Sequence, residues 1–357
     1  MNLMLPREAP GDSEVQEKNK TMNLIIPMAG RGSRLRPHTL TVPKPMVPVA
    51  GKPIVQRLVE DLCSSQDEPF ENIAFVLGDF GEEVEKKLLQ VAEDLGSKGH
   101  IYYQNEPLGT AHAINCAKDY LEGSVIIAFG DTLFEANMDI KPETEGIIWA
   151  KRVEDPSAYG VLELDEDGFI SGFVEKPEEF VSDLAITGIY YIKEGEKLRD
   201  EIQHLLDNDI KEKGEFQLTN ALENMKQKGT KFRAGIINEW LDLGNKHHFV
   251  YSNQRVLELK KDIEELVSQS AKIENSIVIP PCFIGENARI INSVVGPHVS
   301  IGENSSINNS ILQNTVIQNN SEILRALLKD SMIGNKVSYT GKMKNLSIGD
   351  FSEVTNK

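Results

Sequence analysis

The feature that most constrains the fold is a repeat in the last quarter of this 357-residue chain. The tetrapeptides Asn-Ser-Ile-Val, Asn-Ser-Val-Val and Asn-Ser-Ile-Leu begin at Asn275, Asn292 and Asn309, each 17 residues after the one before. Apolar residues also recur six apart within the repeat, as at Ile284 and Ile290. A period of this kind indicates a solenoid of stacked coils. The spacing of six predicts three short strands per coil, as in a short left-handed parallel β-helix.

We expect the β-helix to occupy residues 269–357, with one interruption. Ser321–Asp330 departs from the spacing of six, which predicts a loop or bulge there before the pattern resumes at Ser331 and again at Ser347. Residues 246–268 carry an apolar stripe at helical spacing and are predicted to form a helical linker. Because stacked coils leave open ends, we expect a homo-oligomer that assembles through the β-helix.

The preceding region, residues 23–245, alternates apolar strands with amphipathic helices. This order predicts an α/β domain with a Rossmann-like, mostly parallel sheet and helices on both faces. Such sheets bind ligands at the carboxyl ends of their strands. The predicted strands are 24–26, 73–77, 100–104 and 125–129, and the predicted helices are 54–62, 83–95 and 111–121.

The first 22 residues are predicted to form a flexible tail, because they are polar and contain Pro6, Pro10 and Gly11. The Met-Asn-Leu at the start of the chain recurs at Met22, which makes Met22 a candidate alternative start.

Composition excludes several kinds of partner and compartment. The formal net charge is −17, whereas general binding to nucleic acid or anionic membranes requires a surplus of Lys and Arg. The three cysteines lack metal-ligand spacing and are expected to be reduced thiols. No stretch of 18 apolar residues occurs and the N-terminus is too polar for a signal peptide, so we expect a cytoplasmic protein with no membrane partner.

A glycine-containing loop follows the first predicted strand, Leu24–Ile26. Gly30 and Gly32 allow backbone N–H groups to approach a ligand closely. Arg34 offers a planar set of donors that matches phosphate oxygens, and Lys44, between two prolines, adds a compact positive charge. The segment therefore predicts a phosphate site. A third glycine and a Gly-Lys-Ser/Thr sequence are absent, so neither a dinucleotide fingerprint nor a P-loop is indicated.

Two later segments add polar groups at strand ends. Gln104 ends a predicted strand and precedes Gly109 and Thr110 at a predicted helix start, where an amide side chain suits the edge of a nucleobase. Asp131 follows an apolar strand, and Asp242 lies in Trp-Leu-Asp. Two carboxylates with phosphates and waters are the usual ligands of Mg²⁺.

Residues 24–53 then carry a resemblance. Ala-Gly-Arg-Gly-Ser-Arg-Leu at 29–35, followed by Pro-His-Thr and Pro-Lys-Pro-Met, resembles the signature of the sugar-phosphate nucleotidyltransferases, or NDP-sugar pyrophosphorylases. These enzymes join a sugar 1-phosphate to a nucleoside triphosphate and release pyrophosphate. The resemblance implies that Arg34 and Lys44 are catalytic and that Asp131 and Asp242 hold Mg²⁺. With its β-helix, the chain resembles long-type glucose-1-phosphate thymidylyltransferases, while Gly-Thr-Ala-His-Ala at 109–113 also suits uridylyltransferases.

The resemblance also implies binding residues for both substrates. A glutamine at the position of Gln104 resembles the family members that bind a pyrimidine nucleotide, UTP or dTTP. Those expected to bind the nucleotide are Ala29, Gly30, Gly32, Ser33, Gln104, Gly109 and Thr110. Those expected to bind the sugar phosphate are Gly160, Glu175, Lys176, Thr187 and Glu215.

The expected chemistry is attack by the sugar phosphate on the α-phosphorus, in line with leaving pyrophosphate. The nucleophile is already anionic, so no general base is required, and His38 and His112 are interpreted as structural. Glucose 1-phosphate with dTTP or UTP is the first hypothesis. The alternatives are a UTP-dependent N-acetylglucosamine- or glucose-1-phosphate uridylyltransferase, a bifunctional enzyme with His298 as acetyl-transfer base, and a non-catalytic binding relative.

Overall fold

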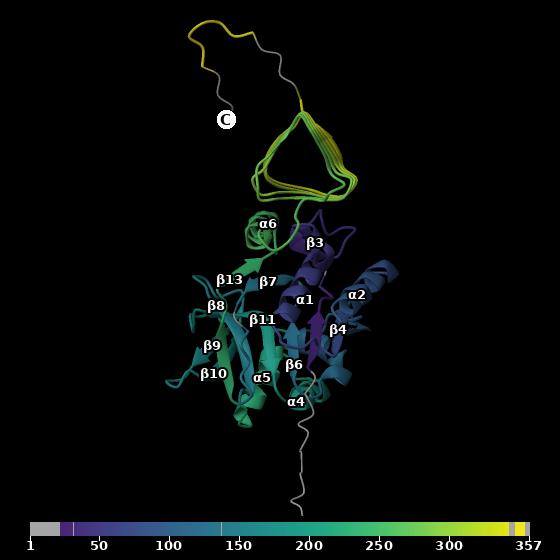
Figure 1. Cartoon of the computed structure of the whole chain (residues 1–357). Coiled ribbons are helices and arrows are strands. Elements are labelled where there is room, and N and C mark those ends of the chain that lie inside the picture. Colours follow the sequence, from purple (N-terminus) through teal and green to yellow (C-terminus); the bar gives the residue numbers. More distant parts are fainter. Residues whose placement is uncertain (1–21, 31, 137, 343–346, 354–357) are drawn as a thin grey trace, which may run out of the picture.

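A computed structural model describes residues 22–30, 32–136, 138–342 and 347–353. The predicted tail, residues 1–22, lies outside this range except for Met22. The chain forms an α/β part and a three-sided β-helix, with one helix between them (Figure 1). The predicted fold class, a Rossmann-like α/β domain followed by a parallel β-helix, is confirmed.

The α/β part is built on a mixed sheet of nine strands, with the main order β10-β9-β11-β6-β1-β4-β5 and β8 and β12 attached at β11. Strands β6, β1, β4 and β5 are mutually parallel, as predicted, whereas β11 and the strands beyond it add antiparallel pairs. The parallel half carries the glycine loop. The strands are β1 (Asn23–Pro27), β4 (Asn72–Leu77), β5 (Lys98–Tyr103), β6 (Val125–Ala128), β8 (Gly146–Arg152), β9 (Gly160–Leu164), β10 (Ile170–Glu175), β11 (Leu184–Ile192) and β12 (Phe232–Ile236).

Both faces of this sheet are covered by helices. α1 (Ile54–Ser64) and α2 (Glu82–Asp94) pack on one face, and α3 (Thr110–Asn115), α4 (Gly195–Asp207) and α5 (Leu218–Gln227) pack on the other. The third predicted helix, 111–121, is shorter than expected: it ends at Asn115, and a separate 3₁₀ turn follows at 118–120.

The central strand β1 shows why the strands of the α/β part are continuous apolar runs in the sequence. Successive side chains of a strand point to opposite faces. Leu24 and Ile26 accordingly join the core beneath α1, whereas Ile25 joins the core beneath α4 and α5. Because both faces are buried, no polar alternation is left in the sequence.

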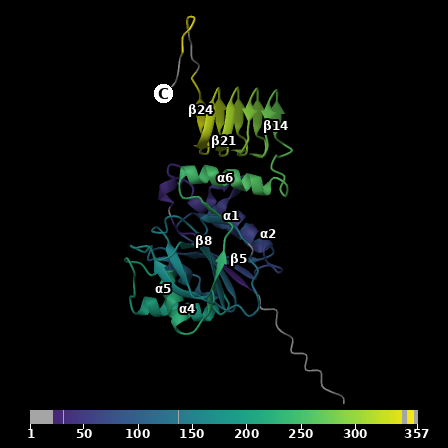
Figure 2. The same cartoon turned by 90° about the vertical axis from the view of Figure 1, so that its left-hand side faces the viewer.

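The β-helix begins after α6 (Lys246–Lys260), which lies along its length (Figure 2). One face is a five-stranded parallel sheet, and the other strands form the two remaining faces. The five strands are β14 (Lys272–Glu274), β17 (Arg289–Ile291), β20 (Ser306–Asn308), β22 (Glu322–Leu324) and β24 (Ser338–Thr340). The others are β15 (Ile277–Val278), β16 (Cys282–Ile284), β18 (Val294–Val295), β19 (Val299–Ile301), β21 (Ile311–Ile317) and β23 (Leu327–Ile333).

The repeated Asn-Ser pairs form one corner of the β-helix. Asn275, Asn292 and Asn309 all have left-handed backbone conformations, which asparagine tolerates better than most residues. The following serines form a ladder: the Oγ of Ser293 donates to Ile291 O at 2.7 Å and accepts from the N–H of Ser310 at 3.0 Å. The tetrapeptide therefore encodes a turn and the hydrogen bond to the next coil.

The structure corrects the predicted interruption at Ser321–Asp330. This segment forms regular strands, because the later coils contain 16 residues instead of 17: β17 pairs Arg289 with Ser306, but β20 pairs Ser306 with Glu322. The residue is lost at one corner, where two residues at 313–314 replace the three at 296–298. A one-residue deletion shifts the apolar pattern without breaking the fold.

Both ends of the β-helix region also differ from expectation. The linker helix α6 ends at Lys260, short of the predicted 268, and Val267 already bridges to Ile284 in the first coil. Among the described residues the last strand ends at Thr340, and Ser347, where the repeat was expected to resume, lies in no strand.

Two outer faces of the β-helix differ in character. The face that contains β16, β19 and the second halves of β21 and β23 packs on α6 and the α/β part. Val316 of β21 and Met332 of β23 belong to the hydrophobic core of the α/β part. A second face carries the aliphatic ladder, defined as Ile277, Val294, Ile311 and Leu327, which stack in register. Leu327 is 80% exposed and Ile311 is 51% exposed.

In the described residues, no helix has the length and apolar character needed to span a bilayer.

We predict that Ser293→Ala destabilises the β-helix by about 1–3 kcal/mol, because the buried N–H of Ser310 loses its acceptor. Thermal unfolding followed by circular dichroism measures the effect. Ser306→Ala, at a half-buried position on the five-stranded face, is the matched control and should change the midpoint little. Equal midpoints for the two variants would contradict the ladder as a source of stability.

Candidate active site

The glycine loop borders a cavity of about 240 Å³ at the carboxyl ends of the parallel strands. This is the position expected for ligands of such a sheet. The cavity brings together nine of the sequence-predicted site residues from segments up to about 185 positions apart. They are Ala29, Gly30, Gly32, Lys44, Gln104, Gly109, Thr110, Asp131 and Glu215.

Lys44 is the buried cation of this cavity. It begins a 3₁₀ turn, Lys44–Met46, is only 5% exposed, and places its Nζ 2.8 Å from Asp131 Oδ2. Gly32 makes room for it: the glycine has φ +60°, and a β-carbon there would lie 2.6 Å from the Cβ of Lys44. The loop glycine and the lysine are thus packed as one unit.

The predicted base-binding residues form the opposite wall. Gln104 Nε2 donates to Gly109 O at 3.0 Å and lies 3.2 Å from His112 Nδ1. Thr110 Oγ1 donates to Gln217 Oε1 at 3.3 Å. Burial lowers the pKa of His112. Glu215 was predicted to bind the sugar phosphate, but it lies beside Gly109 on this wall.

Asp242 reaches the site through strand pairing. β13 (Glu239–Asp242) pairs with β7 (Thr132–Glu135), and this register sets Asp242 opposite Thr132, the residue after Asp131. Asp242 Oδ1 accepts the N–H of Gly244 at 2.7 Å, and Oδ2 lies 2.7 Å from His248 Nδ1. Strand pairing therefore places Asp242 near Asp131 in the backbone, although the two residues are more than a hundred positions apart in the sequence.

Arg34 is exposed and lies beside Asp242. A β-carbon on Gly244 would be 2.9 Å from Asp242 Oδ1 and 3.5 Å from Arg34 Nη2, so both side chains flank the same glycine. The pKa of Tyr159 is raised by burial and then by the charge of Asp242, whereas the charge of Arg34 opposes this shift. Arg34, Asp242 and Tyr159 therefore lie close together, outside the set of residues that line the cavity.

The carboxylates fit a magnesium ion that completes its shell with other oxygens. No group of three or more His, Cys, Asp or Glu side chains with metal-ligand geometry occurs in the described part of the chain. Mg²⁺ commonly takes one or two carboxylates together with phosphate oxygens and waters. Asp131 and Asp242 meet that requirement, since each carboxylate oxygen has more than one lone pair.

A second cluster lies beyond Tyr159. The β9–β10 register sets Gly160 opposite Glu175, and a β-carbon on the glycine would lie 3.0 Å from Glu175 Oε2. Lys176 Nζ is 3.4 Å from Glu175 Oε1, and Thr219 Oγ1 donates to Glu175 Oε2 at 3.3 Å. This cluster presents a carboxylate, a hydroxyl and a half-exposed lysine side by side.

Two further predicted site residues, Thr187 and Ser33, do not line the cavity. Thr187 is buried and donates its hydroxyl to Trp149 O at 2.9 Å, so it does not line the cavity. Ser33 starts the short 3₁₀ turn that carries Arg34 and is exposed. His38, interpreted as structural, lies near Gly334 of the β-helix, and burial lowers its pKa.

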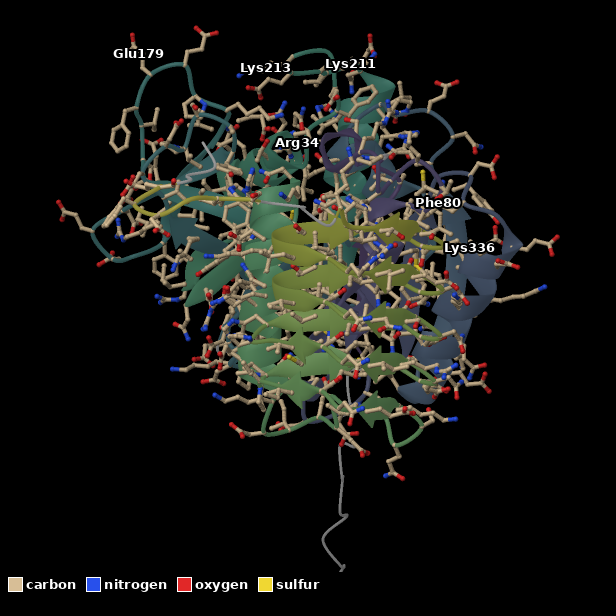
Figure 3. The ribbon with its side chains drawn as sticks, turned by 90° about the horizontal axis from the view of Figure 1, so that it is seen from above. Arg34, Phe80, Glu179, Lys211, Lys213 and Lys336 are labelled. Atoms are coloured by element: carbon tan, nitrogen blue, oxygen red, sulfur yellow. The ribbon has the colours of Figure 1, made fainter. Side chains whose placement is uncertain are left out.

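Several residues at the site were not identified from the sequence. Lys213 Nζ donates to the carbonyls of Glu175 and Lys176 at 3.3 and 2.6 Å, and Figure 3 shows it on the same side of the molecule as Arg34 and Lys211. His248 follows Asn245, whose side chain caps α6. Asn245 is a helix-start signal in the sequence, and it could have indicated that His248 lies in the first turn of a helix. No local sequence signal indicates the contacts of Lys213.

Comparison with known families accounts for both parts of the chain. The nucleotidyl transferase family matches residues 24–258, and the family described as GlmU-like, C-terminal hexapeptide matches residues 263–341.

Individual relatives are similar over most of this chain. It is 32% identical over 262 residues to the bifunctional protein GlmU of Methanococcus maripaludis, covering 72% of this chain but only 59% of the relative. It is 32% identical over 332 residues to the bifunctional protein GlmU of Methanocaldococcus jannaschii, covering 90% and 76%. It is 28% identical over 286 residues to a glucose-1-phosphate thymidylyltransferase of Streptomyces antibioticus, covering 74% and 78%.

We predict that replacement by alanine destabilises the protein at one glycine of the cavity and has almost no effect on stability at another. Gly109→Ala should destabilise the protein by at least about 1–3 kcal/mol, because φ is +120° and the β-carbon would lie 2.4 Å from Phe216 O. Gly30→Ala meets nothing within 4 Å and should stay within about 0.5 kcal/mol of the wild type. Denaturant unfolding compares them, and a stable Gly109→Ala protein would refute this packing.

Proposed function

The chain belongs to the nucleotidyl transferase family, and we propose that it joins a sugar 1-phosphate to a nucleoside triphosphate, giving an NDP-sugar and pyrophosphate. The observation that carries this proposal is the Lys44–Asp131 ion pair of 2.8 Å in the cavity bordered by the glycine loop. A buried lysine beside the backbone amides of the glycine loop suits a polyphosphate, and a carboxylate next to it suits the accompanying cation.

In this proposal, different residues bind the two polyanionic substrates and neutralise their charge. Backbone amides at Ala29–Gly30 and Gly32, with the cationic group of Lys44, hold the triphosphate and neutralise charge at the α-phosphate. Arg34 does the same from the exposed rim. Lys176 holds the sugar phosphate as nucleophile, and Glu175 accepts hydrogen bonds from sugar hydroxyls. Asp131 and Asp242 would hold Mg²⁺, which would supply further positive charge beside the phosphates. Alignment and neutralisation account for the acceleration, without a general base.

We propose dTTP or UTP as the nucleotide and glucose 1-phosphate as the sugar. Gln104 supports a pyrimidine through its carbonyl oxygen, which can accept from a base edge, whereas its Nε2 already donates to Gly109 O. The name of the Streptomyces relative, glucose-1-phosphate thymidylyltransferase, supports the sugar and dTTP. A uridylyltransferase for glucose or N-acetylglucosamine is the nearest alternative.

The bifunctional alternative follows from the names of the two GlmU relatives. Acetyl transfer would require an available base in the β-helix, and His298 was the candidate. His298 Nε2 lies 2.6 Å from Glu258 Oε1 on α6, and the ring is mostly covered. A histidine engaged in this contact between α6 and the β-helix favours a structural role, so acetyl transfer is the weaker candidate.

We also propose that two or more copies associate through the aliphatic ladder. Ile311 and Leu327 are highly exposed, and they stack with Ile277 and Val294 into one continuous apolar strip. A second copy of the same strip would match it in length and character, as in an isologous contact.

The test of activity is pyrophosphate release from purified protein with five triphosphates and a panel of sugar 1-phosphates, with and without Mg²⁺. Lys44→Met and Asp131→Asn should each lower turnover by about a hundredfold or more, because the first removes a positive charge at the transferring phosphate and the second removes a carboxylate that would hold Mg²⁺. Lys86→Met, at a lysine on the exposed face of α2, is the control and should retain turnover.

Release of no pyrophosphate with any pair would contradict catalysis and leave a binding relative. Consumption of acetyl-CoA with glucosamine 1-phosphate would revive the bifunctional alternative.

We predict that Leu327→Lys dissociates the assembly, since it places a charge in the middle of an apolar contact. Size-exclusion chromatography with light scattering gives the mass. Ser306→Lys, on the five-stranded face, should leave the mass unchanged. A monomeric wild type, or an unaltered mass for Leu327→Lys, would count against the ladder as the contact.

A further inference from the structure

The segment directly after Lys44 is a small hairpin, β2 (Pro48–Val49) and β3 (Lys52–Pro53). Its base is fixed close to the lysine, because Val47 N donates to Lys44 O at 3.0 Å and Ile54 N donates to Val47 O at 3.2 Å. The position of the hairpin and the position of Lys44 are therefore coupled through a few hydrogen bonds of the same backbone.

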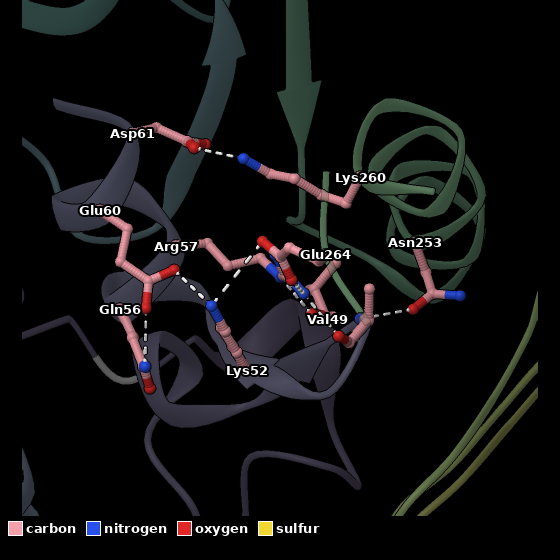
Figure 4. Close-up of polar contacts among 10 residues, drawn as sticks. Val49, Lys52, Gln56, Arg57, Glu60, Asp61, Asn253, Lys260 and Glu264 are labelled. Carbon is pink, nitrogen blue, oxygen red and sulfur yellow. Dashed lines mark hydrogen bonds and ion pairs between the residues drawn. The ribbon is translucent and has the colours of Figure 1, made fainter. Parts of the chain in front are cut away.

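The tip of this hairpin is held by Asn253 of α6. Asn253 is 0% exposed, and its Oδ1 accepts from Ala50 N at 2.9 Å and from Ser300 Oγ at 2.8 Å (Figure 4 shows the Asn253 contact with the hairpin). Ser300 belongs to β19 of the β-helix. One amide oxygen thus joins the hairpin, α6 and the second coil.

Arg57 of α1 makes a second connection. It is 1% exposed and donates to the carbonyls of Val49 at 2.6 Å and Ala50 at 2.5 Å, while its Nη1 lies 3.2 Å from Glu264 Oε1 (Figure 4). Glu264 lies between α6 and the first coil, two residues before Leu266, whose carbonyl accepts from Ile284 N at 2.8 Å. Both sides of the hairpin tip are thus tied to the start of the β-helix.

Packing adds a third connection. Gly51 at the hairpin tip has φ +90°, and a β-carbon there would lie 2.2 Å from the ring of Phe283 in β16. The phenyl ring therefore rests directly on the glycine. A side chain of the first coil thus contacts the segment that follows Lys44 directly, and Ser300 of the second coil is joined to it through Asn253.

Asn253 also carries an uncompensated cost. Its Nδ2 is buried and has no hydrogen-bond partner among the described residues. An unsatisfied buried donor costs about 1–3 kcal/mol. A leucine of similar size would avoid that cost but would accept neither hydrogen bond. The two bonds at Oδ1 are the feature that only the amide, or an acid of the same shape, provides.

We propose that Asn253, with Ser300, is a positioning residue through which the β-helix fixes Lys44 at the cavity. This inference rests on the proposed function, because it assigns to Lys44 the alignment of the triphosphate. A displacement of about 1 Å in an aligning group is enough to cost about a hundredfold in rate. The β-helix then forms part of the support of the active site in addition to any role in assembly.

The experiment compares hydroxyl and amide deletions in the full chain. Asn253→Ala should lower kcat about tenfold and Ser300→Ala about threefold, with KM for both substrates little changed, since alignment is lost and binding is retained. Ser305→Ala is the matched control: this buried serine of the β-helix bonds only to other β-helix groups. It should lower the unfolding midpoint and leave kcat unchanged.

A readout independent of turnover separates this inference from the proposed function. Hydrogen exchange of the 47–54 amides should accelerate in Asn253→Ala and Ser300→Ala but not in Ser305→Ala. If the wild type is inactive, the proposed function fails and the positioning claim fails with it, whereas the exchange data still decide whether the β-helix fixes the hairpin.

Unchanged kcat and unchanged exchange in Asn253→Ala would overturn the inference. So would an equal loss of kcat in Ser305→Ala, which would show general destabilisation. Asn253→Asp keeps both acceptor bonds and should restore part of the kcat lost in Asn253→Ala; absence of any rescue in folded protein would also count against it.

Discussion

The structure depends on holding one buried lysine in place. A cation that is 5% exposed requires a fixed partner, since burial of an unpaired charge is strongly unfavourable. Asp131 provides that partner at the end of β6, and Gly32 provides the space for the lysine stem. The prolines on either side of Lys44 restrict the backbone further. Because of this requirement, the glycine loop, the central strand and the following hairpin act as one assembly.

Long-range pairing supplies what the local sequence around Lys44 lacks. The β7–β13 pair brings Asp242 beside Asp131, and the β9–β10 pair brings Glu175 beside Gly160. The two clusters meet at Tyr159, whose ring lies 5.0 Å from that of Trp240. A site for two anionic molecules is thus distributed over several strand ends, which keeps cations close together in a chain with a net charge of −17.

The sequence predicted the parts whose physics is local. Strand β1, the glycine loop and the Asn-Ser corners follow from apolar runs and from the tolerance of Gly and Asn for left-handed backbone. Positions that depend on distant contacts were less accessible. Glu215 lies on the base-side wall because Phe216 packs against Gly109, and Thr187 is turned to Trp149 O. The shorter coils were mistaken for an interruption, since a deletion of one residue shifts every later apolar position.

The length of α6 has a consequence for how such chains vary. The helix has 15 residues, which at 1.5 Å per residue span about 22 Å. Five stacked strands about 4.8 Å apart span about 19 Å, and α6 runs beneath them from end to end. The length of α6 therefore matches the length of the β-helix. A further coil would overhang α6 and expose an apolar underside, so coil number and helix length are expected to change together in evolution.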